Sequence, residues 1–115
     1  MSSGKGVKPS HVLVQLTATL RNVAVSGSSR KQFVQTGCVE ELCGVLRAAP
    51  QHAELCLNVS RVLAKLSLHE DVRGRIEARS EHLDGLLQAL ALHAATSAPL
   101  LIRLCFILGL SLIHI

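Results

Sequence analysis

The sequence predicts an all-α fold in which a set of three helices is repeated along the chain. The first observation is the stretch 13–24, LVQLTATLRNVA, where apolar residues recur at the spacing of one helix face. These residues are Leu13, Leu16, Leu20 and Val23. The second observation is that the same register returns at Leu63, 43 residues after Leu20, and at Leu108, 45 residues further on. A helix that recurs at this period is typical of a stacked helical repeat.

The composition favours the same fold. The 115 residues are 49% apolar but include no Trp, no Tyr and only two Phe, so the core must be aliphatic. Leu and Ala favour helices, and the clusters of β-branched residues that a sheet would need are sparse. The length is that of one modest domain. The net charge of +4 is ordinary, and with only two aromatic residues for base stacking the composition argues against nucleic-acid binding.

The cysteines and the first ten residues indicate the compartment. MSSGKGVKPS contains no apolar segment of a secretory signal, so we expect an intracellular, cytoplasmic protein with free thiols. The four cysteines are interpreted as small buried hydrophobes: Cys38, Cys43, Cys56 and Cys105. The most apolar run, 100–115, is shorter than the ~20 residues of a membrane span and is interrupted by Arg103 and His114. We therefore expect no membrane association.

The first long helix follows a short polar lead. Residues 1–9 are rich in Gly, Ser and Lys, and we expect this lead to be disordered. Ser10 is a suitable N-cap for the helix that follows. The helix is predicted to run to about Val25, where a segment rich in Ser and Gly ends it.

Two shorter helices complete the first unit. A short helix is predicted over 30–36 with Phe33 as an apolar contact, and Gly37 is expected to stop it in the left-handed conformation. A helix of medium length follows over 39–49. Pro50 then ends this helix or opens the next one.

The same order of helices repeats in the second half of the chain. The second long helix is predicted over 51–68, and the next short helix ends at about Arg79. A helix of medium length follows over 81–95, and a third long helix starts within 97–99. Three kinds of helix thus each keep their own register over two copies, which an unrelated Leu-rich bundle would not do.

This order of long, short, medium and again long helices resembles the armadillo repeat. The residues that carry the resemblance are the helix end 20–24, LRNVA, followed by Phe33, Gly37, Leu42 and Leu46. The resemblance covers residues 10–109. It implies an armadillo-type right-handed α-solenoid fragment of about two and a half three-helix repeats. HEAT repeats share the period and are the alternative subtype.

The resemblance also implies a binding face, because the long third helices line the concave side of armadillo proteins. Their outward positions, aligned by the period, give a candidate face: Gln15, Arg21, Asn22, Asn58, Arg61, Lys65 and Arg103. Family members often use an Asn near the end of this helix to bind the backbone of an extended peptide. Asn22 fits that role, but Lys65 and Leu110 occupy the equivalent positions. The face is weakly basic and predicts an acidic or polar peptide or helix as partner, with a solvated helix surface as the alternative.

The function that follows is a non-catalytic protein–protein interaction scaffold or adaptor. No nucleophile stands with a base, and no small-molecule substrate or cofactor is indicated. His52 and Cys56 have a spacing that could share a metal, but no second ligand pair accompanies them, so no metal is expected. A nucleic-acid-binding helical repeat and a regulatory helical domain of a larger protein are the alternatives. A closer resemblance of residues 16–24 and 101–109 to one member of the family implies a role in assembling cilia or flagella.

The C-terminal residues carry two further expectations. The third long helix is apolar and lacks a polar capping unit, so we expect the chain to self-associate through it. The residues expected to stay partly uncovered are Leu101, Leu104 and Leu108. Residues 110–115, LSLIHI, depart from the family's sequence and are interpreted as a non-native scar, with a genuine helix end of unusual sequence as the alternative.

Overall fold

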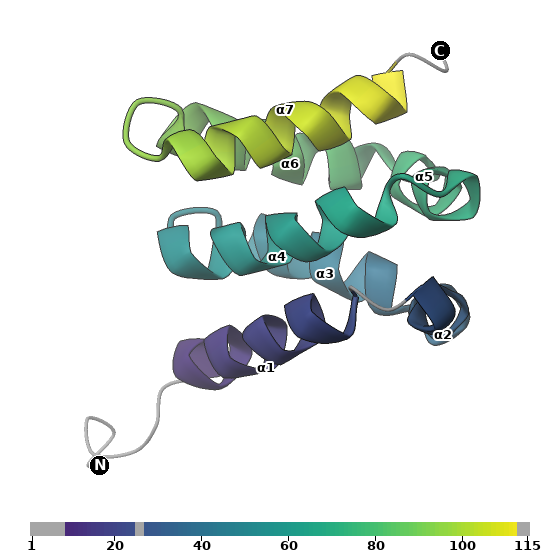
Figure 1. The fold of residues 1–115 in the computed structure, drawn as a ribbon. Coiled ribbons are helices and arrows are strands. Elements are labelled where there is room, and N and C mark those ends of the chain that lie inside the picture. The colour runs from purple at the N-terminus through teal and green to yellow at the C-terminus, as the bar shows by residue number, and fades with distance from the viewer. Residues whose placement is uncertain (1–8, 25–26, 113–115) are drawn as a thin grey trace.

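The computed structural model describes residues 9–24 and 27–112 of the chain. Within these residues it contains α-helices and one short 3₁₀ helix, η2 (Gly27–Ser29), and no strand. The α-helices are α1 (Pro9–Val23), α2 (Arg30–Gln35), α3 (Cys38–Ala48), α4 (Ala53–Leu66), α5 (Glu70–Glu77), α6 (Ser80–His93) and α7 (Ala98–Leu112). The long helices α1, α4 and α7 stack in one layer, α3 and α6 lie behind them, and α2 and α5 lie at one end (Figure 1). The predicted all-α solenoid is confirmed.

The predicted order of helices is confirmed, although several ends shift by a few residues. α1 begins at Pro9 instead of after Ser10 and ends at Val23. Gly37 has a φ of 77°, the left-handed conformation that the sequence predicts at the end of the first short helix. α4 begins two residues later than predicted because His52 caps it, its Nδ1 accepting a hydrogen bond of 3.3 Å from the Leu55 N–H.

Two sequence predictions concern residues that lie wholly or partly outside the described ones. The predicted disordered lead covers residues 1–9, of which only Pro9 is described, and it belongs to α1. The predicted scar covers residues 110–115, of which 110–112 continue α7 as helix and 113–115 are not described. The interpretation of residues 110–115 as non-native stays a prediction.

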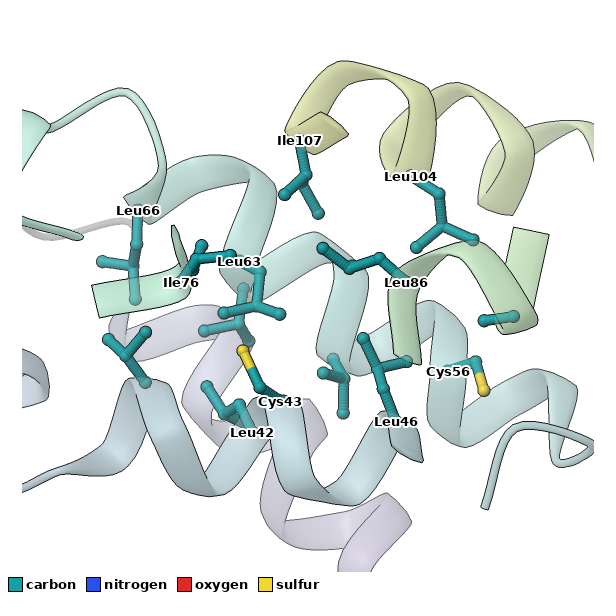
Figure 2. Packing of buried hydrophobic residues seen from close by; sticks show 14 of the residues in the cluster. Leu42, Cys43, Leu46, Cys56, Leu63, Leu66, Ile76, Leu86, Leu104 and Ile107 are labelled. Carbon is teal, nitrogen blue, oxygen red and sulfur yellow. The ribbon is translucent and has the colours of Figure 1, made fainter. Parts of the chain in front are cut away.

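The core is aliphatic, as the composition predicts, and it joins both layers of helices. Figure 2 shows apolar side chains of α3, α4, α6 and α7 converging on one cluster. Leu46, Leu63, Leu86 and Leu104 are each fully buried within it. Because each comes from a different helix, the cluster ties the two repeated units to each other.

The predicted apolar face of the first helix is only partly correct. Leu16 is 51% exposed and Val23 is also exposed, whereas Thr17 and Ala24 are buried. Among the described helices, α4 covers α1 from one side only, so α1 buries the side that meets α4. α4 lies between α1 and α7, and its Val59, which corresponds to Leu16, is 0% exposed. Equivalent positions in the repeated sequence pattern are therefore buried to different extents, because α1 and α4 have different neighbouring helices.

The expectation for the third long helix is wrong for two of its three leucines. Leu104 and Leu108 are buried, and Leu101 is half-buried. They are covered because α7 packs against both α4 and α6. The exposed apolar residues lie on the other side of α7, where Ile102 is 65% exposed and Phe106 is 44% exposed. This helix therefore does present apolar surface, but through different side chains.

Among the described residues, three ion pairs connect the first unit to the second along the exposed ends of the short and medium helices. Arg30 pairs with Asp71, the Arg47 guanidinium lies 2.8 Å from the Glu81 carboxylate, and that of Arg75 lies 3.2 Å from Glu40. Exposed pairs of this kind contribute about 0–1 kcal/mol each. They therefore contribute little to the stability of the fold.

The cysteines differ in burial more than the sequence predicts. Cys43 and Cys56 are buried as expected, Cys38 is half-buried, and Cys105 is exposed on α7, contrary to the prediction. Burial raises the pKa of the Cys43 thiol to about 12, with a further contribution from Glu40, and raises that of Cys56 to about 11. Both thiols therefore stay protonated at neutral pH, and only the thiolate form reacts readily.

These differences predict selective alkylation. In dilute solution at pH 8, iodoacetamide should modify Cys105 first, whereas Cys43 and Cys56 should react only after denaturant is added. Mass spectrometry of peptides after timed quenching measures each rate. Modification of native Cys43 as fast as Cys105 would contradict the packing of α3 described above.

Candidate functional site

Four basic side chains from three successive long helices gather at one depression. Arg21 of α1, Arg61 and Lys65 of α4, and Arg103 of α7 line a hollow of about 360 Å³, together with Ala64 and Leu68. We call these four cations the basic cluster. The stacking of α1, α4 and α7 in one layer brings them together, since residues more than 80 positions apart in the chain then share one surface (Figure 1). No acidic residue is among the residues that line this hollow.

The buried side chain of Asn58 accepts a hydrogen bond from Arg21, one residue of the basic cluster. Its side-chain oxygen accepts a hydrogen bond of 3.4 Å from Arg21 Nη1, and its amide nitrogen donates to the Val14 carbonyl at 3.3 Å. Asn58 is only 5% exposed. The sequence groups Asn58 with the partner-binding residues, but the structure places it between α1 and α4, where it orients Arg21.

The two other arginines of the basic cluster are partly covered. Arg103 donates a hydrogen bond of 3.0 Å from Nη1 to the Pro99 carbonyl, one turn earlier in α7. Burial lowers the pKa of the Arg61 guanidinium, and the positive charges of Arg103 and Arg21 lower it further. Arg21, Arg61 and Arg103 line the same hollow, so their like charges repel one another there. A bound anion would relieve this repulsion.

The remaining candidates of the predicted face lie apart from the basic cluster. Gln15 is exposed and lines a separate depression of about 650 Å³ that His11 and Glu54 also line. Asn22 is exposed on α1 and lines neither depression. The structure therefore brings four of the seven predicted residues together, places Asn58 behind them, and leaves Gln15 and Asn22 at the margins.

Leu68 is a member of the site that sequence reasoning missed. It follows the C-terminal end of α4 and is exposed, although it is a large apolar side chain, and it lines the same hollow as Lys65. The sequence predicts a helix that extends to residue 68 and therefore gives no signal for this role, whereas the structure ends α4 at Leu66 and leaves Leu68 in an exposed turn, where apolar side chains often take part in binding. It gives the hollow an apolar wall beside the cations.

The two residues whose spacing could share a metal, His52 and Cys56, make local hydrogen-bonding contacts instead. His52 caps α4 through its Nδ1, and the Cys56 thiol lies 3.4 Å from the Ala49 carbonyl, so each is engaged locally. Across the described residues, no three His, Cys, Asp or Glu side chains come close enough to hold a metal ion. In the same part of the chain, no helix combines the length and apolar content needed to cross a bilayer.

Comparison with known proteins identifies relatives over most of the chain. It is 32% identical to armadillo repeat-containing protein 2 of Mus musculus, and 29% identical to the proteins of the same name in Homo sapiens and Bos taurus. Each match extends over 99 residues, which is 86% of this chain. The chain spans 12% of the length of the mouse relative and 11% of the other two. Neither a family model nor a solved structure matches.

Proposed function

We propose that this chain, which is related to armadillo-repeat proteins, is a non-catalytic interaction scaffold that binds an acidic segment of a partner protein at the basic cluster. The observation that carries the proposal is that cations from α1, α4 and α7 line one hollow, with no acidic residue among the residues lining it. Repeat proteins commonly bind partners along the surface formed by successive units. A partner that spans Arg21, Arg61 and Arg103 would contact all three long helices.

The chemistry of the hollow favours carboxylates beside an apolar side chain. Guanidinium groups bind carboxylates through paired hydrogen bonds, and such charge-assisted bonds are stronger than neutral ones. Leu68 and Ala64 supply apolar contact next to Lys65. An acidic peptide or helix that carries one apolar residue matches this arrangement, and Gln15 and Asn22 are available for polar contacts further along α1.

The proposed interaction also has a proposed place in the cell. The proposed setting is intracellular and cytoplasmic, and the resemblance of residues 16–24 and 101–109 to a family member implies a role in assembling cilia or flagella. The similarity to armadillo repeat-containing protein 2 supports this choice. Fluorescence imaging of the tagged chain in ciliated cells tests it, and a signal that never approaches the cilium or its base would count against it.

The binding proposal is tested by reversing the charge of two residues on one helix. The double variant Arg61→Glu with Lys65→Glu should weaken binding of a Glu- and Leu-containing helical peptide by about tenfold or more, because charge-assisted bonds contribute about 1.5–3 kcal/mol each. Fluorescence anisotropy at physiological salt measures the affinity. The matched control is Lys31→Glu with Arg79→Glu, which changes the net charge equally at exposed positions outside the hollow.

Three outcomes distinguish the hypotheses about the ligand of the basic cluster. Loss of affinity in the first double variant alone supports the proposal. Equal affinity in both double variants overturns the assignment to the basic cluster. Tight binding of generic duplex DNA or RNA, with an affinity that falls steeply as salt rises, would favour the nucleic-acid alternative instead.

A further inference from the structure

Each long helix of this fold has two stacking sides, and the hydrogen bonds of Asn58 show which is which. Asn58 reaches Val14 and Arg21 of α1, so the side of α4 that contains Asn58 faces the preceding long helix. Leu55, Val59 and Leu66 lie on this same side at helical spacing, and all are buried. We call the corresponding side of any long helix its leading side, and the opposite one its trailing side.

The leading side of α1 is apolar and uncovered by any described helix. Its members occupy positions that are buried in α4: Val12, Leu16 and Val23 correspond to Leu55, Val59 and Leu66. All three are exposed on α1. In α7 the equivalents of the first two are Leu100 and Leu104, which are fully buried against the preceding units. These exposed α1 side chains are thus apolar, like their equivalents in α4 and α7, which a neighbouring long helix covers.

The trailing side of the last unit is the complementary surface. Ile102 and Cys105 of α7 lie on this side and are exposed. Cys105 corresponds to Ser60 of α4, which is 0% exposed because α7 packs over that side. Behind α7, Leu87 of α6 is exposed where its equivalent in α3, Cys43, is buried under α6.

We infer that copies of this chain associate head to tail, with the trailing side of α7 in one copy packed on the leading side of α1 in the next. Such a contact repeats the α1–α4 and α4–α7 packing that already occurs twice within the chain. Both surfaces are apolar at Leu16 and Ile102, so joining them removes no charged side chain of these sets from water. Because this contact joins two different surfaces and continues the stack of long helices in one direction, it generates open chains whose length rises with concentration.

Complementation between two variants tests this inference. The wild-type chain should show a mass above 12.3 kDa that increases with concentration in sedimentation velocity. Leu16→Glu removes the leading side and Ile102→Glu removes the trailing side, so each variant alone should remain a monomer. An equimolar mixture should form dimers and no larger species. The two intact surfaces, one from each variant, are used up in the dimer contact, and both free ends carry a substituted surface.

The control is Leu92→Glu, on an exposed leucine of α6. Its equivalent in α3, Ala48, stays exposed although α6 covers α3, so Leu92 lies outside the stacking surfaces and its variant should associate like wild type. Circular dichroism establishes that every variant is folded. A wild-type chain that stays monomeric at all concentrations overturns the inference and indicates a different occupant. Dimers of Leu16→Glu alone, or a mixture that stays monomeric, would also overturn it by excluding the head-to-tail arrangement.

Discussion

Leu63→Ala is expected to lower the free energy of unfolding by about 2–5 kcal/mol, the range for removing a buried leucine side chain. Leu63 is 0% exposed and lies on α4, the helix that packs against α1, α3 and α7. A cavity at this point would weaken packing within both repeated units. Domains are typically stable by only about 5–15 kcal/mol, so the loss is a large fraction of the total.

Urea denaturation followed by circular dichroism measures the change, and Leu16→Ala is the matched control. Leu16 belongs to the same predicted apolar pattern, but it is 51% exposed, so its truncation should cost less than about 1 kcal/mol at concentrations where the chain is monomeric. Equal losses at Leu16 and Leu63 would mean that α1 is covered from both sides, which contradicts the fold described here.

Gly85→Leu is expected to destabilise the protein by about 1–3 kcal/mol, because it forces a side chain into the contact between α3 and α6. A Cβ atom at Gly85 would lie 3.4 Å from the Arg47 Cβ and 3.5 Å from the Arg47 Cα. The remaining leucine atoms would have to displace the backbone of α3. That cost exceeds the gain of ~1 kcal/mol that any non-glycine residue brings to a helix interior.

Gly44 in α3 provides the control of opposite sign. Apart from the adjacent residues and the backbone of α3 itself, no atom lies within 4 Å of a Cβ built at Gly44, so Gly44→Ala should add about 0.5–1 kcal/mol of stability through helix propensity alone. Thermal unfolding of the two variants side by side tests both expectations. A Gly85→Leu variant as stable as Gly44→Ala would show that α3 and α6 are not in close contact at this point.

Much of the candidate site could be predicted from periodicity. The 43- and 45-residue offsets place Arg61 and Arg103 on helices of the same kind, and the structure brings them to one hollow with Arg21 and Lys65. The repeat period alone could not distinguish predicted site residues that face solvent from Asn58, which faces a neighbouring helix. Asn58 has the same register as Arg103, but its hydrogen bonds to α1 make it a positioning residue, and this depends on side-chain reach across a helix contact.

The sequence by itself determined the helical class, the order of long, short and medium helices and the aliphatic core, because these follow from local spacing and composition. The tertiary structure alone decided which apolar residues are covered. Leu16 and Val59 hold equivalent positions in the pattern, but only Val59 has helices packed on both sides of its own helix. Burial is a property of neighbouring elements, and a repeating pattern is identical in every copy whether or not another unit lies beside it.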